Sequence, residues 1–232
     1  MNLFVGTSGY SYPKCKGKFY PKDLPAKQML HFYAGHFRSV ECNSTFRRMP
    51  DPDIVEKWAA EVPADFKFAL KAPQRITHIK RLKDSDDLVS NLFDVAAILK
   101  KRLGPVLFQL PPNFKKDAAR LSEFLSLLPK RCRAAFEFRH ETWFDEEIFQ
   151  LLKKHNVALC IAEADDELKV PVVATAKWGY LRLRKEKYSE AELKTWIKRV
   201  QKQTWSDAFV YFRHEDTAKG PKFAKKFLDF AG

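Results

Sequence analysis

The sequence predicts an α/β fold with a single domain, a TIM-like (β/α)8 barrel over residues 1–232. Two observations support this prediction. Eight short runs rich in β-branched and aromatic residues recur along the chain, and segments with the apolar spacing of amphipathic helices lie between them. Strands that alternate with helices form parallel sheets. Eight such repeats can close a barrel, whereas doubly wound sheets more often contain five to seven strands.

The expected elements follow one another in regular order. The eight expected strands are Leu3–Gly6, Ser39–Asn43, Phe66–Lys71, Val106–Leu110, Ala134–Arg139, Val157–Ala162, Tyr180–Arg184 and Ala208–His214. Helical periodicity covers residues 26–37, 53–62, 87–104, 117–129, 142–155 and 189–202. Thr142 and Ser189 stand where N-caps belong, and Glu192 completes a capping box with Ser189. No Gly/Ser-rich linker divides the chain.

The composition indicates a packed globular protein with basic character. Of 232 residues, 45% are apolar, and 42 Lys and Arg against 29 Asp and Glu give a net charge of +13, which favours anionic partners. No segment resembles a secretory signal or reaches the roughly 20 apolar residues of a membrane helix. The four cysteines form no CxxC pair. We therefore expect a cytoplasmic protein without membrane association or an evident obligate protein partner.

The stretch AAFEFRHETW places charged residues on one face of an expected strand. Phe136 and Phe138 would pack under the helices, so Glu137 and Arg139 would point into the barrel. Both faces of a parallel sheet are covered, so inward charges must be paired, solvated in a pocket or functional. The sequence therefore predicts a polar mouth at the C-terminal end of the barrel, where the active sites of such barrels lie.

The same alternation adds charged and polar residues to this mouth from four other strands. The added residues are Glu41, Asn43, Lys71, Gln109, Arg182 and Arg184. Positive charge exceeds negative charge in this set, so the predicted guest is an anion such as phosphate or carboxylate. The candidate catalytic residues are Glu137, Glu41, Lys71 and His214, with Asn43, Gln109, Arg139, Arg182 and Arg184 binding the substrate.

Lys71 supports a separate hypothesis about the chemistry. A lysine surrounded by other cations has a lowered pKa and can form a Schiff base with a carbonyl; the alternative is an ion-paired structural lysine. The chain has no nucleotide-binding glycine loop and no multi-histidine metal motif. No cofactor is therefore implied, although a single divalent ion held by Glu41, Glu137 or Asp165 stays open.

Two expected loops on the same face combine basic and aromatic residues. The proposed rim consists of Tyr10, Tyr12, Lys14, Lys16, Lys18 and Tyr20 after the first strand, and of Arg75, Lys80 and Arg81 after the third. Basic residues can follow a phosphate backbone and aromatic rings can stack on bases, so this rim suits nucleic acid. In the alternative interpretation, the aromatic rings cap the barrel and the lysines are simply solvated.

Several motifs along the whole chain resemble one family. GTSGYSY, VECNSTFRRMP, FKFALKAPQRITH, GPVLFQLPP, AAFEFRHETW, YLRLR and YFRHEDTAKGPKFA are similar, in this order, to motifs of the DUF72 (YecE-like) family. The resemblance implies a TIM-barrel fold and adds Thr7, Ser8 and Thr77 to the candidate substrate-binding residues. A role on DNA, by analogy with endonuclease-IV-like barrels, has been suggested for the family. The scarcity of histidine and aspartate ligands departs from a trinuclear-metal endonuclease.

These patterns lead to one leading functional hypothesis and two alternatives. The leading hypothesis is an enzyme that binds a phosphate-bearing substrate at the mouth and acts on nucleic acid, by strand cleavage or by processing a damaged or abasic site. One alternative is a hydrolase or lyase for a small phosphorylated or carboxylated metabolite. The other is a nucleic-acid-binding barrel without catalysis.

Overall fold

Eight parallel strands form a closed barrel in which each strand pairs with the next and the last pairs with the first. The computed structural model describes residues 1–165, 168–213 and 218–232. The strands are β1 (Asn2–Ser8), β2 (Ser39–Cys42), β3 (Lys67–Lys71), β4 (Leu103–Gln109), β5 (Ala134–Glu137), β6 (Ala158–Glu163), β7 (Gly179–Leu183) and β8 (Asp207–Arg213). All eight expected strands are present, and the predicted fold class is confirmed.

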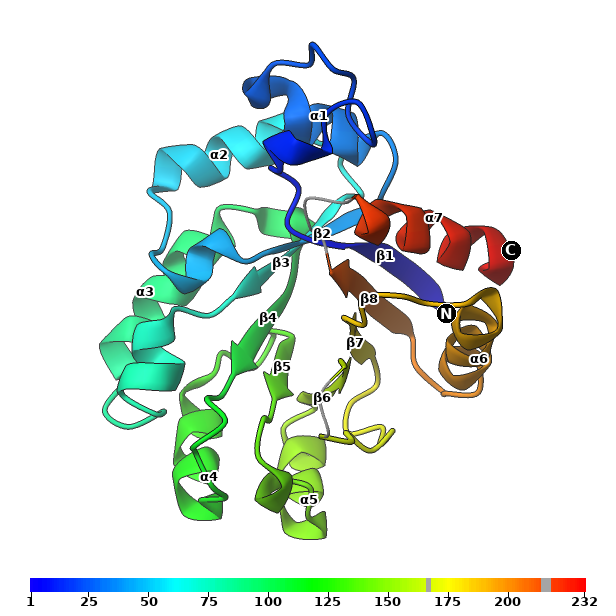
Figure 1. Cartoon of the computed structure of the whole chain (residues 1–232). Helices are drawn as coiled ribbons and strands as arrows, with labels where there is room; N and C mark the ends of the chain where they lie inside the picture. The colour runs from blue at the N-terminus through cyan, green and yellow to red at the C-terminus, as the bar shows by residue number, and fades with distance from the viewer. Residues whose placement is uncertain (166–167, 214–217) are drawn as a thin grey trace.

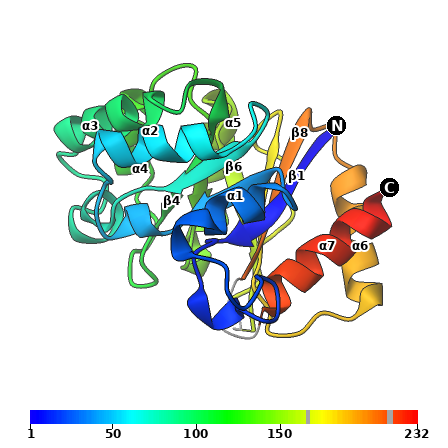
Figure 2. The same cartoon turned by 90° about the horizontal axis from the view of Figure 1, so that it is seen from above.

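The helices lie outside the ring of strands, as Figures 1 and 2 show. The described residues form α1 (Met29–Ala34), α2 (Pro52–Glu61), α3 (Asp86–Ala97), α4 (Ala118–Leu127), α5 (Glu146–Lys154), α6 (Glu190–Gln201) and α7 (Lys219–Ala231). Helix α7 was not among the expected helices. It packs on β1 and β8 and buries Ala224 and Phe227. No described helix has the length and apolar character needed to cross a membrane.

The connection between β6 and β7 departs from the expected alternation, because residues 164–165 and 168–178 contain no helix. The segment includes Pro171 and lacks helical apolar spacing. Instead, the Thr175 hydroxyl donates to the Val157 carbonyl at 2.8 Å and accepts from the Leu159 amide at 2.7 Å. This side chain fastens the loop to the start of β6.

The two predicted helix caps had different outcomes. Ser189 and Glu192 form the expected capping box at the start of α6. Thr142 was predicted wrongly, because Asp145 caps α5 by accepting from the Glu147 amide. Thr142 lies in a short 3-10 turn, and its hydroxyl accepts from the Lys116 amide at 2.9 Å.

The alternation predicted for β5 is present. Phe136 and Phe138 face the helices, where Phe136 stacks on Phe108 at 5.2 Å between ring centroids and Phe138 stacks on Trp143 at 4.7 Å. The lumen holds a separate apolar cluster that includes Phe4, Ala69, Leu107, Ala135, Cys160 and Phe209. This cluster fills the middle of the barrel, so the polar residues at its two ends are separated by a packed layer.

The N-terminal end of the barrel is closed by its own polar group. Asp207 accepts from Asn2 at 2.7 Å and is ion-paired with Arg133. Lys67, at the start of β3, bonds to the main-chain oxygen of Lys101. These contacts join the beginnings of several strands. Residues at this end of a TIM barrel typically contribute to stability and not to catalysis.

Candidate functional site

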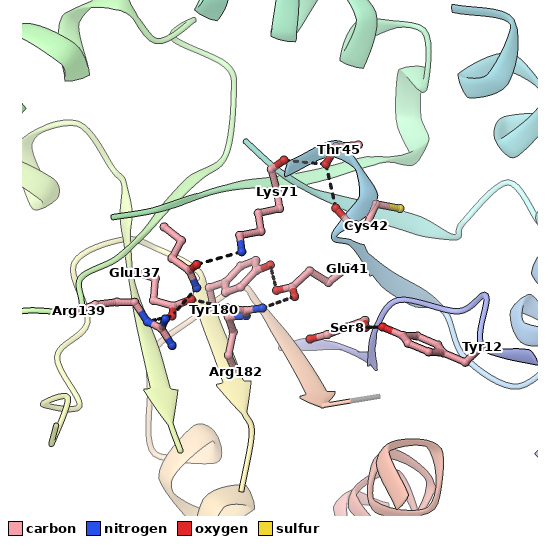
Figure 3. Close-up of polar contacts among 11 residues, drawn as sticks. Ser8, Tyr12, Glu41, Cys42, Thr45, Lys71, Glu137, Arg139, Tyr180 and Arg182 are labelled. Atoms are coloured by element: carbon pink, nitrogen blue, oxygen red, sulfur yellow. Dashed lines mark hydrogen bonds and ion pairs between the residues drawn. The ribbon is translucent and has the colours of Figure 1, made fainter. Parts of the chain in front are cut away.

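A buried arginine joins two carboxylates at the C-terminal end of the barrel. Arg182 Nη1 donates to Glu137 Oε2 at 2.5 Å, and Nη2 donates to Glu41 Oε1 at 2.8 Å. The Tyr180 hydroxyl donates to Glu41 Oε2 at 2.7 Å. Figure 3 shows these side chains meeting across the lumen from β2, β5 and β7. All four are buried.

Both carboxylates are held in the ionised form. Burial disfavours ionisation of Glu137, but Arg182 and Arg139, with Arg184, outweigh it and lower the pKa of this carboxyl to about 2. The pKa of Glu41 is also lowered, because Arg182 and the Tyr180 hydroxyl overcome its burial. A carboxylate with so low a pKa is a weak base at neutral pH, so proton transfer by Glu137 loses support.

Lys71 extends this network from the end of β3. Its Nζ donates to Gln109 Oε1 at 3.0 Å, and Gln109 Nε2 donates to Glu137 Oε1 at 2.8 Å. The Lys71 Nζ lies 3.9 Å from the centroid of the Phe46 ring. The Thr45 hydroxyl lies 2.6 Å from the main-chain oxygen of Lys71, which fixes the end of the strand. Only 9% of Lys71 is exposed.

The ammonium of Lys71 is destabilised by its surroundings. Burial is the largest cause, and the positive charge of Arg182 adds to it, while Glu137 and Glu41 act in the opposite direction. Together they lower the pKa of Lys71 to about 8. No carboxylate of the described chain forms an ion pair with Lys71. A substantial fraction of this lysine is therefore a neutral amine slightly above pH 7.

Two further arginines lie at the edge of the network. Arg139 Nε is 3.3 Å from Glu137 Oε1, and about a third of its side chain is exposed (35%). Arg184 has a buried Nε with no partner among the described residues. Both line a small hollow of about 20 Å³ together with Glu137. When Lys71 is protonated, the mouth has a net charge of two, because its four cations outnumber its two carboxylates. The cations are Lys71, Arg139, Arg182 and Arg184, and the carboxylates are Glu41 and Glu137.

The contacts of Arg182 argue against its predicted role in binding the substrate anion directly. Both terminal nitrogens of Arg182 already contact carboxylates, so a substrate anion would have to displace Glu41 or Glu137. Glu41 is fully buried behind the same contacts. Lys71, Arg139 and Arg184 are therefore the cations that can face a ligand.

The remaining substrate-binding candidates do not all face the mouth. Ser8 is buried beside Glu41, with which it pairs in register. Asn43 has a buried Oδ1 without a partner in the described chain, and it lines a hollow of about 250 Å³ next to the mouth. Thr7 faces away from the mouth and contacts the Tyr33 hydroxyl, because adjacent strand residues point to opposite faces. Thr77 is buried, 2.9 Å from His78 Nδ1.

The aromatic part of the predicted rim has a structural role. Tyr20 is buried, and its hydroxyl bonds to the Tyr10 carbonyl, while Phe19 packs against Phe32 of α1 at 5.7 Å. The Tyr12 hydroxyl donates to the Ser8 carbonyl at 2.9 Å. The prediction that Tyr20 offers a stacking surface was therefore wrong, because this long loop uses its rings as a core of its own.

The basic part of the rim is only partly available. Lys14, Lys18 and Arg75 are exposed and Lys16 is half-buried. Arg81 donates to Asn113 Oδ1 at 3.2 Å, and Lys80 bonds to the Asp84 carbonyl. Lys14, Lys18 and Arg75 are therefore the rim cations whose side chains reach the solvent most fully.

Three residues of the site were missed in the sequence. Tyr180 shares the inward phase of Arg182, so the alternation of YLRLR could have revealed it. Phe46 lies in a short 3-10 helix (Ser44–Phe46) and His78 in a short π-helix (Arg75–Ile79), and their rings meet at 4.9 Å. Burial and then the charges of Lys71 and Arg139 lower the pKa of His78. No sequence signal marks these two.

Two further predictions concern metal binding and the last strand. The described residues contain no cluster of three His, Cys, Asp or Glu side chains that could hold a metal ion. The Asp165 carboxylate accepts from the Glu186 amide at 2.8 Å, a partner that it does not share with Glu41 or Glu137. His214, the fourth catalytic candidate, lies outside the described residues.

The match to known proteins covers almost the whole chain. Residues 4–232 match the family described as "protein of unknown function DUF72". The chain belongs to the DUF72 family. Among curated relatives of this DUF72 protein, YecE of Escherichia coli is 35% identical over 143 residues, which are 61% of this chain and half of YecE. YunF of Bacillus subtilis is 24% identical, over 98% of this chain and 94% of YunF.

Solved structures agree with the barrel of this DUF72 protein. A DUF72 family protein of Thermotoga maritima has a TM-score of 0.88 at 27% identity, covering 99% of this chain and 98% of that one. A DUF72 protein of Enterococcus faecalis gives 0.82 at 18% identity over 99% and 95%. The D-psicose 3-epimerase of Clostridium cellulolyticum, at 0.58 and 10% identity over 100% and 98%, shares the fold alone.

Proposed function

We propose that this DUF72 protein is an enzyme that binds a phosphate-bearing, anionic substrate at the C-terminal mouth of its barrel. The observation that carries the proposal is the positive charge left at the mouth once Arg182 is bound to Glu41 and Glu137. Arg139 and Arg184 border the same hollow, and the Nε of Arg184 is unused within the described chain. Guanidinium groups in this position suit phosphate or carboxylate oxygens.

The proposed roles follow from the contacts of each residue. Arg139 and Arg184 bind the anion. Lys71 is the reacting group, because its amine combines burial with a pKa near neutrality, whereas Glu137 stays ionised. Gln109 orients the Lys71 amine, and the ionised Glu137 holds Gln109 and Arg182 in place.

Nucleic acid is the substrate class that we propose first. The net charge of +13 attracts polyanions, and exposed Lys14, Lys18 and Arg75 lie on the loops that follow β1 and β3. The proposed reactions are strand cleavage or processing of a damaged or abasic site. The substrate's phosphates would contact the loops, and its reacting group would reach Lys71.

A small phosphorylated or carboxylated metabolite is the second candidate. Two observations favour it: the mouth hollow between Arg139 and Arg184 is small, and the rings of the first loop are packed inward. A narrow, half-buried cationic site suits one anionic group better than a polymer that needs a stacking platform.

We also infer that the protein works in a reducing compartment such as the cytoplasm. Cys15, Cys42 and Cys160 are buried free thiols. Burial raises the pKa of the Cys42 and Cys160 thiols, which keeps them unreactive. Localisation of the tagged protein in cells tests this inference, and an extracellular location would contradict it.

A cleavage assay tests the leading function. Labelled single-stranded, duplex, abasic and base-damaged DNA and matching RNA are incubated with the protein, with and without EDTA. We expect cleavage of at least one substrate, loss of cleavage in Lys71→Met, and retention in Lys67→Met, which changes the other end of the same strand. Absence of cleavage on every substrate by folded protein would reject nucleic acid and direct the search to phosphorylated metabolites.

A further inference from the structure

We propose that the Lys71 amine forms a Schiff base with an aldehyde or ketone carbon of a phosphate-bearing substrate. This inference rests on the proposed function, because the phosphate must be held at the same mouth. It narrows the substrate to a carbonyl compound and the reaction to imine chemistry.

The contacts of Lys71 distinguish it from other lysines of the chain. Lys116 and Lys185 are paired with carboxylates of Asp145 and Glu192, which favour the charged ammonium. The Lys71 Nζ instead meets a neutral amide oxygen at 3.0 Å, and no carboxylate of the described chain pairs with it. The face of the Phe46 ring, 3.9 Å from Nζ, favours the ammonium, but less strongly than a carboxylate would. A neutral acceptor can orient a neutral amine as well as an ammonium.

Charged groups face Lys71 from several elements. Arg182 and Arg184 act from β7 and its end, Glu137 from β5 and Glu41 from β2. The charge of Lys71 also acts on His78, in the π-helix after β3, and lowers its pKa. Glu41 and Glu137 are already bonded to Arg182, so they compensate the Lys71 charge only partly. With its pKa lowered to about 8, Lys71 has more of the neutral amine near neutral pH than an exposed lysine has.

The proposed step needs no oxidant or reductant. The neutral amine attacks the carbonyl carbon, a C–N bond forms as the C=O π bond opens, and a proton moves from nitrogen to oxygen. The carbinolamine hydroxyl takes up a second proton, from solvent, and leaves as water, while the nitrogen lone pair forms the C=N bond of the iminium. The iminium withdraws electrons from the C–H bond of the neighbouring carbon, which assists loss of that proton. A phosphate on the next carbon can then leave with its bonding electron pair. Hydrolysis with one water restores Lys71.

The anion site gives this chemistry its selectivity. Glu137 Oε1 accepts from Gln109 Nε2 at 2.8 Å and lies 3.3 Å from Arg139 Nε. Because Gln109 also contacts the Lys71 amine at 3.0 Å, and Arg139 and Arg184 line one hollow, the arginines and the amine share one mouth. A substrate with phosphate on the arginines can present its carbonyl to Lys71. An abasic deoxyribose in DNA and a small sugar phosphate both have this combination of groups.

Reductive trapping tests the proposal with defined probes. The protein is incubated with glycolaldehyde phosphate, with uncharged glycolaldehyde or with an abasic-site oligonucleotide, each with sodium cyanoborohydride. Intact mass and peptide mapping then locate the adducts. We expect one saturable adduct on Lys71, formed at a concentration at least tenfold lower with a phosphate-bearing probe than with glycolaldehyde.

Two matched variants decide the assignment. Lys71→Arg keeps the positive charge but cannot be trapped, so its saturable adduct should disappear. Lys67→Arg alters the lysine at the opposite end of β3 and should leave the adduct unchanged. Circular dichroism establishes that both variants are folded. Equal labelling in Lys71→Arg, or adducts spread over surface lysines, would overturn the proposal.

Pyrophosphate binding, measured by calorimetry on the same samples, separates the two levels of inference. Binding that is weakened in Arg139→Gln, combined with no adduct on Lys71, would reject the Schiff base and leave the anion site standing. Absence of both binding and adduct would reject the proposed function as well.

Discussion

The two ends of the barrel both carry charged residues, but they are arranged differently. At the N-terminal end, Asp207 contacts Arg133 and Asn2, and Lys67 is bonded to a main-chain oxygen. At the C-terminal end, the two terminal nitrogens of Arg182 are paired with carboxylates. Among the described residues, the Nε atoms of Arg182 and Arg184 are buried without a partner, and the side-chain acceptor of Lys71 is a neutral amide.

This difference shows which charges serve stability and which are available for a ligand. Buried polar groups normally have hydrogen-bond partners. An incompletely paired cation at the mouth therefore marks a position where contacts with a bound anion can offset the cost of burying the charge. The matched lysines at the ends of β3 make the contrast testable. Lys67 is a structural lysine in this view, whereas Lys71 is a functional one.

The largest effect is expected from Arg182→Met. The change removes the buried cation that Glu41 and Glu137 share, so the free energy of unfolding should fall by about 3–5 kcal/mol. Urea unfolding measures it, and Arg139→Gln, which removes a partly exposed partner, should cost about 1 kcal/mol or less. Equal losses in the two variants would contradict the distinction.

A smaller effect is expected from Asp207→Asn at the N-terminal end. Loss of the carboxylate weakens the contact with the half-exposed Arg133 and should lower the free energy of unfolding by about 1–2 kcal/mol. Pyrophosphate binding at the mouth should not change, because the apolar layer of the lumen separates the two ends. Calorimetry checks the binding, and a weakened affinity would show that the ends are coupled.

Lys71→Met should separate stability from function. Methionine fills a similar space without a charge to desolvate, so the free energy of unfolding should stay within about 1 kcal/mol or increase. Activity and reductive trapping should be lost. Urea unfolding beside the trapping assay measures both, and a strongly destabilised variant would indicate a structural lysine instead.

The dependence of stability on pH should identify the same residue. Lys71 has a pKa of about 8 in the folded state and a usual value of 10.5, so between these values the unfolded chain binds more protons. The contribution of Lys71 to stability therefore rises as pH increases from about 8 to 10.5. Glu137 acts at acid pH: its contribution is present above 4.5 and is lost as pH falls toward about 2. Unfolding of wild type and Lys71→Met between pH 7 and 10 tests the first window, and parallel curves would contradict it.

The smallest effect is expected where both partners of an ion pair are exposed. Arg38 and Asp65 have side chains that are 60% and 61% exposed, and water solvates both after the pair is broken. Arg38→Gln should give no measurable change in urea unfolding, trapping or pyrophosphate binding. A clear loss in any of these would show that charge outside the mouth matters as well.

The sequence by itself determined the barrel and the identity of most mouth residues. Strand residues alternate between two faces with a period of two, so the phenylalanines of β5 fixed the direction of Glu137, and the leucines of β7 fixed that of Arg182. The same reasoning could have included Tyr180. Repetition along the chain then gave eight strands and a closed parallel sheet.

Only the tertiary structure decided which residues pair. Glu41, Glu137 and Arg182 come from strands that meet across the lumen, and sequence spacing contains no information on that approach. Phe46 and His78 lie in a 3-10 helix and a π-helix that are too short for a period to reveal side-chain direction. The ring of Tyr20 packs inward because the loop must bury apolar area, which depends on contacts with distant residues. Side-chain direction is local and periodic, whereas partner choice is set by long-range packing.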